Sequence, residues 1–536
     1  MEGVPDGFLG IVGAALRARA RRRSILVWEG DGAERFFDAW DGKADGGEVW
    51  IFQVTGWGHA STPHAMIRRK TGVRLFRVQR HEGWEPSDLA LRADVYVFIR
   101  QVLPADLEES YPVSRIGRVI SRGGVLMGTR SDVRWISAAE RAGFVGEAGF
   151  AVPDGVWAKS FVGRVTDSGW GGIDGGRVAV IGAGLAGSAV ADGLALRGVE
   201  VDVFDGSGIG QAASGNRAAV LVPMVSMDDG LPARLSRFGC HRVGAELRVD
   251  GTGKECGVLQ LAVSERIRRV RDAGSGGEGF RVVDSAEAEE LSGMRGIEGG
   301  LWFSEAGWID PSTLCGLRLA RHGCRVAFRR ERVTGFEQCG RLYSLHGEGK
   351  KNIGEGYGAV VLATAGIPDW MPWEGQRLGM KLAWGRNVTL EAERLAGLRA
   401  VVTGAGYCIP LGSGFVHLGA TYEFEEVPTM DDGSAVDVIW EKSAGAWAGQ
   451  APRGAWEVRR AMRVLTADRL PMVGQVGDSG VFIACGLGSR GAVWSGVVGE
   501  LIPALAMGEP SIFPRAWVEA LDPARFSGGI RGRGRP

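Results

Sequence analysis

The chain has 536 residues, with 63 Lys and Arg balanced by 63 Asp and Glu, and 45% of its residues are hydrophobic. This length exceeds one compact core and predicts two to four domains. The balanced charge excludes a global field that would draw the chain onto nucleic acid or an anionic membrane. Any polyanion site must therefore be a local patch, and the arginine-rich segments 17–23 and 531–535 are two candidates.

Seven scattered cysteines, with no CxxC pair among them, indicate reduced thiols in a cytoplasmic protein. The same pattern argues against a zinc site, and we expect no metal. No apolar stretch reaches the roughly 18 residues needed to span a bilayer, so we expect no membrane partner. The sequence leaves the oligomeric state open, and a monomer is compatible with it.

Residues 1–165 are predicted to form one α/β domain. Apolar extended segments at 24–28, 49–54, 95–99 and 125–127 alternate with stretches that suit helices at 33–40 and 114–120. A glycine-rich segment at 166–176 follows and is typical of a linker.

The segment 177–187 reads RVAVIGAGLAG and carries the strongest signal in the chain. Gly182 permits a tight turn, Gly184 lets the backbone approach a pyrophosphate, and Gly187 lets an alanine-rich helix pack closely on the strand. The next predicted strand ends on Asp205, which is placed to accept hydrogen bonds from ribose hydroxyls. Strand, turn, helix and acid together predict a dinucleotide-binding βαβ unit.

Three later segments could line the same cofactor. Residues 213–219 follow the ribose acid, 359–366 read as a buried strand that ends in a small-residue turn, and 483–491 run from a strand through a glycine turn into a helix. Each alone would equally fit a glycine-rich turn without a ligand, because the chain has 87 glycines. The candidate cofactor contacts in these segments are Ser214, Gly215, Asn216, Thr364, Gly366, Gly486, Gly488, Ser489, Arg490 and Gly491.

Several short runs are shared with a known family. They resemble the flavin domain of the bifunctional tRNA 5-methylaminomethyl-2-thiouridine biosynthesis enzyme. The runs are the glycine turn at 182–187, 214–216 (SGN), 300–311, 404–410, 419–422, 469–474 (RLPMVG), 486–491 (GLGSRG) and 521–526. The resemblance implies an FAD-binding Rossmann domain of the D-amino-acid oxidase or glycine oxidase type over residues 177–526. A mixed-sheet substrate lobe would be inserted in it, in parts of 257–333 and 381–461, and a basic tail would follow at 527–536.

This resemblance implies an activity on tRNA. The family's flavin domain oxidises the carboxymethylaminomethyl group of the wobble uridine, which releases glyoxylate and leaves an aminomethyl group. A substrate carboxylate calls for a guanidinium fork. Arg463 aligns with the family's arginine, Arg490 is the second candidate, and Tyr407 and Tyr422 could add hydroxyls. Two alternatives stay open: an oxidase of small amines such as glycine or sarcosine, and a non-catalytic tRNA-binding module that keeps FAD as structure.

In the same family the N-terminal part is a Rossmann-like methyltransferase that uses S-adenosylmethionine. Here the second strand ends on Thr55 and Gly56, where an acid would hold the ribose diol. Arg100 occupies the place of the family's aspartate beside the reacting amine, and a cation there could not accept a proton. The sequence therefore predicts a degenerate methyltransferase domain and doubtful S-adenosylmethionine binding, with an active enzyme of displaced residues as the alternative.

Overall fold

The computed structural model describes residue 173 and residues 176–526, apart from 275, 278, 372–379, 425–428, 446–447, 450–455, 478 and 508–512, and it describes eight strands before residue 173. The chain divides into two compact units, residues 1–170 with 509–519 and residues 171–508 with 520–536. The helix predicted at 33–40, residues 114–119 of the second predicted helix, Arg100, the arginines at 17–22 and the tail at 527–536 lie outside the described residues.

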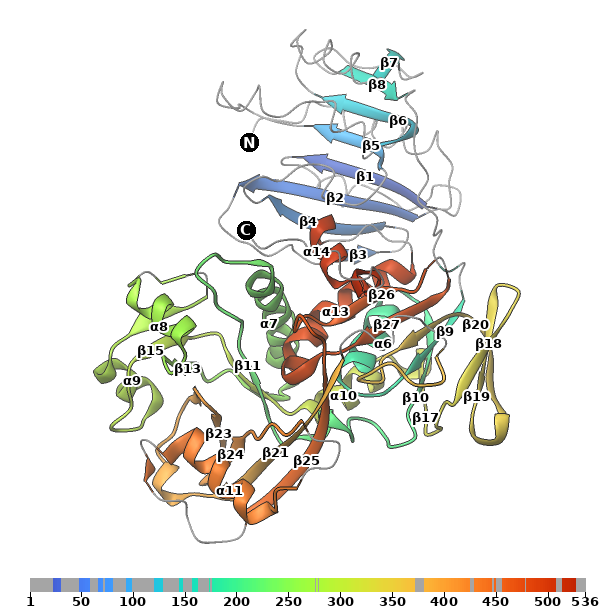
Figure 1. Cartoon of the computed structure of the whole chain (residues 1–536). Helices are drawn as coiled ribbons and strands as arrows, with labels where there is room; N and C mark the ends of the chain where they lie inside the picture. Colours follow the sequence, from blue (N-terminus) through green and yellow to red (C-terminus); the bar gives the residue numbers. More distant parts are fainter. Residues whose placement is uncertain are drawn as a thin grey trace. The chain divides into compact units, whose positions relative to one another are not determined.

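The described strands of the first unit form one sheet (Figure 1). Its strands are β1 (Arg23–Glu29), β2 (Glu48–Trp57), β3 (Met66–Lys70), β4 (Val73–Arg80), β5 (Ala93–Phe98), β6 (Ile120–Gly128), β7 (Phe144–Glu147) and β8 (Trp157–Phe161). The parallel core runs β4-β2-β1-β5-β6, and the antiparallel β8 lies between β6 and β7. This core has the order 3-2-1-4-5 of a doubly wound sheet. All four predicted strands lie in it.

The second unit contains another sheet with the same core order. Its parallel strands are β9 (Arg177–Ile181), β10 (Glu200–Phe204), β17 (Val326–Arg329), β20 (Asn352–Leu362) and β27 (Val481–Cys485). They lie in the order β17-β10-β9-β20-β27, again 3-2-1-4-5. Antiparallel additions are β18 (Gly335–Cys339), β19 (Leu342–His346) and β26 (Met472–Gln475). Strands β9, β10 and β27 and the second half of β20 are buried over nearly their whole length, which explains their unbroken apolar runs.

Four helices pack around the start of this sheet: α6 (Leu185–Leu196), α7 (Leu231–Asp250), α10 (Pro311–Ala320) and α13 (Gly491–Ala506). Helix α6 packs against both α10 and α13, and α7 packs against α13 (Figure 1). Helix α10 begins where Asp310 accepts a hydrogen bond from the Thr313 amide at 3.0 Å, with Pro311 as its first residue. Because α6 is covered on several sides, it is apolar all round rather than amphipathic.

The substrate lobe is a mixed sheet in the order β14-β15-β13-β22-β23-β24-β21-β25. Its strands are β13 (Val258–Leu261), β14 (Arg281–Val283), β15 (Gly300–Phe303), β21 (Lys381–Glu391), β22 (Val401–Thr403), β23 (Tyr407–Gly412), β24 (Phe415–Gly419) and β25 (Trp456–Leu465). Helix α11 (Asp432–Trp440) packs on β21 and β24, where Val388 and Leu390 join its buried Val436 and Ile439. The face of β21 opposite α11 lines the candidate functional site.

The remaining elements connect these layers. A small sheet joins β11 (Ala219–Leu221), β16 (Gly307–Ile309) and β12 (Gly253–Lys254). Helices α8 (Glu265–Asp272) and α9 (Ser285–Ser292) belong to the lobe, and α14 (Arg515–Leu521) follows α13 along the chain. Of the range 257–333 in which the lobe was expected, α10 and β17 pack instead with the parallel sheet.

Candidate functional site

The turn between β9 and α6 is closely packed at all three predicted glycines, and two of them meet backbone. Gly182 has φ +111°, and a Cβ there would lie 2.4 Å from the carbonyl oxygen of Ala363. A Cβ on Gly187 would lie 1.8 Å from the carbonyl oxygen of Gly182, and one on Gly184 would lie 2.9 Å from the Ser214 hydroxyl. A side chain at Gly182 or Gly187 would therefore force the backbone apart at the start of α6, and one at Gly184 would displace the Ser214 hydroxyl.

The predicted ribose acid and Ser214 also lie at this turn. Asp205 follows the last residue of β10, and its carboxylate accepts hydrogen bonds from the amides of Ala183, at 2.9 Å, and Ser207, at 2.8 Å. The Ser214 hydroxyl accepts a hydrogen bond from the Leu185 amide at 3.0 Å, in the first turn of α6. Asn216, two residues later, has a buried Oδ1 with no partner among the described residues. The loop thus lies against the helix N-terminus, with one acceptor unused.

The two later glycine segments meet each other beside β25. The Gly486 amide donates to the Ala365 carbonyl at 2.7 Å, and the Thr364 hydroxyl donates to the Gly366 carbonyl at 2.7 Å. Gly486 and Gly488 have positive φ values of 70° and 56°. A Cβ on Gly366 would lie 3.3 Å from Val464 of β25. Segments that are more than a hundred residues apart therefore converge, with α13 beginning at Gly491.

Arg463 and the two predicted tyrosines lie together on the sheet of the lobe. The Arg463 guanidinium carbon is 5.1 Å from the centre of the Tyr422 ring, which is a cation–π contact. Burial raises the pKa of Tyr407 to about 12, and the Arg463 charge partly offsets this rise. Tyr407 therefore stays neutral at physiological pH and can donate a hydrogen bond.

Small residues make room for this guanidinium. Arg463 pairs with Ala383 across β25 and β21, and a Cβ on Gly385 would lie 2.5 Å from Arg463 Nη1. Gly419 plays the same part for Tyr407, because a Cβ there would lie 2.2 Å from the phenol oxygen. At these two positions the Arg463 guanidinium and the Tyr407 phenol therefore lie directly against the backbone of a glycine.

Arg490 is half-buried near the same place. Its Nη1 donates to the Val222 carbonyl at 3.4 Å, and the structure shows no carboxylate partner for it among the described residues. Burial lowers the pKa of Arg490 below its ordinary value, and the nearby charge of Arg266 adds to the fall although Cys240 opposes it. Tyr422 also lies within electrostatic range. All four predicted substrate residues thus fall into one neighbourhood, and their roles stay predictions.

Buried polar atoms without a hydrogen-bond partner indicate whether this part of the structure suits a ligand. Among the described residues, Arg463 Nη1, both amide atoms of Asn387 and His417 Nε2 are buried without a hydrogen-bond partner. A buried polar group without a partner costs about 1–3 kcal/mol, so such groups are rarely gathered without a reason. Together with the glycine turns and Asn216, they fit a polar cofactor and an anionic substrate.

Three residues of this site were missed in the sequence. Arg459 donates to the carbonyls of Gln211 and Ala212, at 2.6 and 2.8 Å, and so fastens the loop before Ser214 to the lobe. Asn387 and His417 lie inside strands, and His417 shares a 2.9 Å hydrogen bond with Thr389. Burial lowers the pKa of His417 to about 3, with Arg217 adding to the effect, so its ring is neutral. Nothing in the local sequence pattern distinguishes Arg459 from its neighbour Arg460. For Asn387 the one available signal is an Asn within an otherwise apolar strand.

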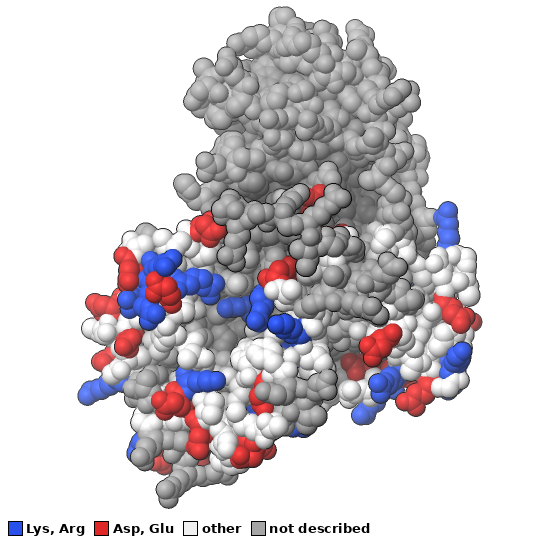
Figure 2. All heavy atoms as spheres, viewed as in Figure 1, with Lys and Arg blue, Asp and Glu red and all other residues white. Residues whose placement is uncertain are grey.

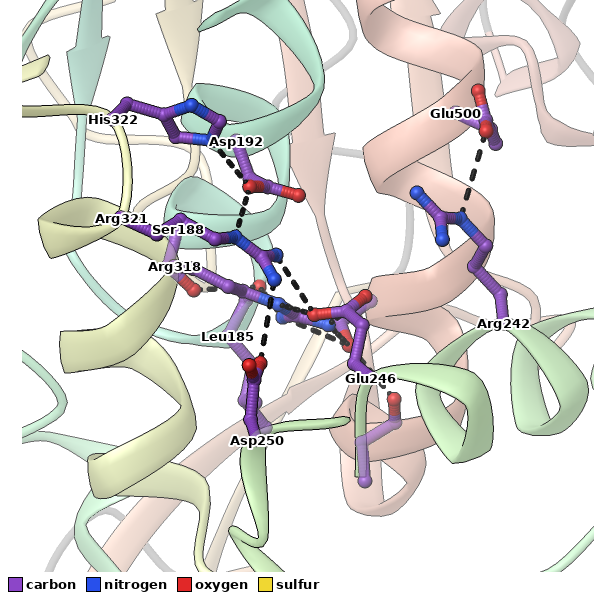
Figure 3. Close-up of polar contacts among 12 residues, drawn as sticks. Leu185, Ser188, Asp192, Arg242, Glu246, Asp250, Arg318, Arg321, His322 and Glu500 are labelled. Atoms are coloured by element: carbon purple, nitrogen blue, oxygen red, sulfur yellow. Dashed lines mark hydrogen bonds and ion pairs between the residues drawn. The ribbon is translucent and has the colours of Figure 1, made fainter. Parts of the chain in front are cut away.

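A second buried polar cluster lies along α6 (Figure 3). It consists of Asp192, Glu246, Arg318, Arg321 and His322. Arg318 binds both oxygens of Glu246, at 2.8 and 3.2 Å, and also donates to the Leu185 carbonyl and the Ser495 hydroxyl. Asp192 Oδ1 lies 2.6 Å from both Arg321 Nε and His322 Nε2. The cluster therefore ties α6 to α7, α10 and α13.

The charges of this cluster stabilise one another. Burial alone would raise the pKa of Asp192, but the hydrogen bonds from His322 and Arg321 outweigh it, and the pKa lies below its ordinary value. Burial acts in the same way on Glu246, where the Arg318 charge and hydrogen bonds lower the pKa. Both carboxylates are therefore ionised at neutral pH.

The surface charge is mixed, and it is locally rich in arginine. Figure 2 shows Lys and Arg side chains gathered over α8, with Asp and Glu among them. Arg268 and Arg269 pair with Glu265, at 3.5 and 3.0 Å. In the described part of the chain, no cluster of three or more His, Cys, Asp or Glu side chains could hold a metal ion. None of the described helices is long and apolar enough to cross a membrane.

The fold and site define a dinucleotide-binding oxidoreductase: a doubly wound sheet with a glycine turn at its switch point, and a mixed-sheet lobe whose arginines lie beside it. Residues 177–505 match the FAD dependent oxidoreductase family, and the chain belongs to that family. The predicted FAD cofactor, the oxidoreductase class and the fold class of this part of the chain are thereby confirmed.

Two relatives carry the name recognised in the motifs. The chain is 32% identical over 402 residues to the tRNA 5-methylaminomethyl-2-thiouridine biosynthesis bifunctional protein MnmC of Paraburkholderia phytofirmans, which covers 66% of this chain and 60% of the relative. It is also 32% identical over 387 residues to the protein of that name from Azoarcus sp., which covers 65% of this chain and 60% of the relative. The chain thus spans about 60% of the length of these relatives.

Solved structures share the fold. Glycine oxidase from Geobacillus kaustophilus superposes with a TM-score of 0.53 at 21% identity, over 67% of this chain and all of that protein. Iminodiacetate oxidase from Chelativorans sp. superposes with a TM-score of 0.52 at 23% identity, over 65% of this chain and 99% of that protein. At these identities the likeness concerns the fold.

Proposed function

We propose that the second unit oxidises the carboxymethylaminomethyl group of the tRNA wobble uridine. The observation that carries the proposal is the pair Arg463 and Arg490, two half-buried guanidiniums for which the structure shows no carboxylate partner among the described residues. A substrate carboxylate would supply the missing negative charge. The shared motifs and the names of the relatives at 32% identity support tRNA as its carrier.

The chemistry follows from a secondary amine beside an acidic CH2 group. Bound FAD would accept a hydride from that carbon, and it would be held by the turn of Gly182, Gly184 and Gly187 with Asp205 and Ser214. The amine loses its proton, the resulting C=N bond is hydrolysed by water, and the products are glyoxylate and the aminomethyl nucleoside. Arg463 and Arg490 would hold the carboxylate, and the neutral Tyr407 hydroxyl would donate a further hydrogen bond to it.

A tRNA needs phosphate contacts that the net charge does not supply. Helix α8 carries Arg266, Arg268, Arg269 and Arg271 against Glu265 and Asp272, and Arg266 lies near Arg490. This excess of arginine begins beside the proposed carboxylate site. It provides a local positive patch that the phosphate backbone of a tRNA could contact (Figure 2). A tRNA substrate would place the protein in the cytoplasm.

Nucleoside analysis tests the proposal directly. The purified protein is incubated with tRNA that carries 5-carboxymethylaminomethyl-2-thiouridine, and the wobble nucleosides and glyoxylate are quantified by mass spectrometry. We expect one glyoxylate for each aminomethyl nucleoside formed. Unchanged tRNA together with hydrogen peroxide from free glycine or sarcosine would favour the small-amine oxidase. A flavin that stays oxidised when the modified tRNA is added without oxygen would favour a binding module.

For the first unit we propose a methyltransferase-type domain without methyltransferase activity. Support comes from Thr55, which lies inside β2 where the resembled family would place an acid, and from the parallel core order of the sheet. Aminomethyl-modified tRNA is incubated with labelled S-adenosylmethionine. We expect no label in the tRNA, and clear methyl transfer would overturn the proposal.

A further inference from the structure

The short segment Thr421–Phe424 follows β24 and runs beside β21. Glu423 and Trp384 exchange backbone hydrogen bonds of 2.9 and 2.8 Å, and the Thr421 amide donates to the Arg386 carbonyl at 3.1 Å. The segment is therefore extended, with side chains that alternate between two faces. Thr421 and Glu423 point inward and are buried, whereas Tyr422 and Phe424 point outward.

A buried ion pair fixes this alternation. Arg386 is 2% exposed and its guanidinium contacts the Glu423 carboxylate, while its backbone amide donates to the Thr421 hydroxyl at 2.9 Å. A shift of the segment by one residue would bury two aromatic rings in place of Thr421 and Glu423 and remove the buried carboxylate partner of Arg386, which would keep only the exposed Asp432 at 3.4 Å. The exposure of Tyr422, at 45%, and Phe424, at 55%, is thus built into the fold.

Tyr422 lies at the candidate substrate residues, and Phe424 extends from the same face of the segment two residues later. The Arg463 guanidinium lies over the Tyr422 ring, and Arg490 lies within electrostatic range of it. Side chains two residues apart on one face of a strand are about 7 Å apart, which leaves room for one flat ring between them. Exposed aromatic side chains beside arginines are the usual means of holding unstacked bases of single-stranded RNA loops.

We propose that Tyr422 and Phe424 form a stacking platform for the uracil ring of the modified nucleotide, which directs its 5-substituent toward Arg463. The platform rests on the proposed function and names how the same site takes an RNA base. An oxidase of glycine or sarcosine would have no ring to place there. Phe424 should therefore affect the binding of tRNA far more than the oxidation step.

Steady-state kinetics with modified tRNA tests the platform. Phe424→Ala is expected to raise KM for the tRNA about tenfold, since stacking on one ring contributes at that level, and to leave kcat within about twofold. Phe424→Trp should restore the KM, because it offers an even larger ring. Phe415→Ala is the matched control: Phe415 is 45% exposed at the start of β24, and its loss should leave KM unchanged.

Flavin absorbance verifies that each variant holds its cofactor and is folded. A wild-type KM for Phe424→Ala, or an equal rise for Phe415→Ala, would overturn the platform and leave the proposed function standing. If the wild-type protein does not oxidise the tRNA, the proposed function fails, and the platform fails with it.

Discussion

The second unit contains two buried polar clusters that differ in one respect. Asp192, Glu246, Arg318, Arg321 and His322 form a closed cluster, in which each charge meets an opposite charge at 2.6–3.2 Å. Asn387, Tyr407, His417 and Arg463 form an open cluster, in which three residues keep buried atoms without a partner among the described residues.

This difference distinguishes buried polar groups that stabilise the fold from those that are available to a ligand. A buried charge that is paired within the protein stabilises a particular packing, here that of α6 against α7, α10 and α13. A buried polar atom without a partner costs free energy unless a ligand satisfies it. Changes in the closed cluster should therefore affect folding, and changes in the open cluster should affect turnover.

The largest effect is expected in the closed cluster. Arg318→Met leaves Glu246 buried without its main partner, and we expect the free energy of unfolding to fall by about 3–5 kcal/mol. Urea unfolding followed by circular dichroism measures this. The double variant Arg318→Met/Glu246→Leu should lose less than Arg318→Met alone, because it removes the uncompensated charge. An additive loss would contradict the account of a closed cluster.

In the open cluster, Arg463→Met should leave the unfolding free energy nearly unchanged and lower kcat/KM about 100-fold, because a carboxylate loses a charged hydrogen-bond partner. Arg460→Met is the control on the same strand, since Arg460 is exposed and lies over the Trp384 ring at 5.3 Å. Oxidation assays on both variants measure the difference. Equal losses for the two would show that the position of Arg463 is unimportant.

The pH dependence of stability should also distinguish the clusters. The pKa of His417 falls from 6.5 to about 3 on folding, because burial penalises its charged form. Below pH 6.5 the unfolded chain binds a proton on His417 that the folded chain does not bind. The contribution of His417 to the free energy of unfolding is therefore fully present above pH 6.5, and the free energy of unfolding falls by up to about 1.4 kcal/mol per pH unit below it. His417→Gln should flatten this fall between pH 6.5 and 4.5.

In the closed cluster the pH dependence of stability comes from ionised carboxylates rather than from a neutral histidine, and it begins at a lower pH. Its carboxylates have lowered pKa values, so their contribution is present above about pH 4.5 and is lost only below it. Unfolding curves of wild type and His417→Gln that stay parallel down to pH 4.5 would contradict the assignment of a neutral buried His417.

The smallest effect is expected from Tyr407→Phe, which removes one hydrogen-bond donor. We expect kcat/KM to fall about tenfold or less, with no change in the pH profile below pH 10, because the pKa of Tyr407 is raised to about 12. Tyr343→Phe is the matched control. Its hydroxyl accepts from the Gly480 amide at 2.9 Å, so this variant should lose stability and keep its kinetics.

Local sequence determined the nucleotide half of the site. The spacing of Gly182, Gly184 and Gly187, and Asp205 at the end of the next strand, are short-range features that fix a turn and a helix start whatever lies beyond them. Shared motifs then located Arg463, Arg490, Tyr407 and Tyr422. These signals were sufficient for the class of cofactor, and they selected four candidate substrate residues that the fold brings into one neighbourhood.

Tertiary structure alone decided which polar groups have partners. Gly385 makes room for Arg463 only because β21 and β25 pair in a register set by residues about 80 positions apart. The same holds for Asp192, an acid in an apolar helix, whose partners Arg321 and His322 come from the end of α10. Such pairings depend on strand register and helix packing between distant segments, and local periodicity carries no information about either.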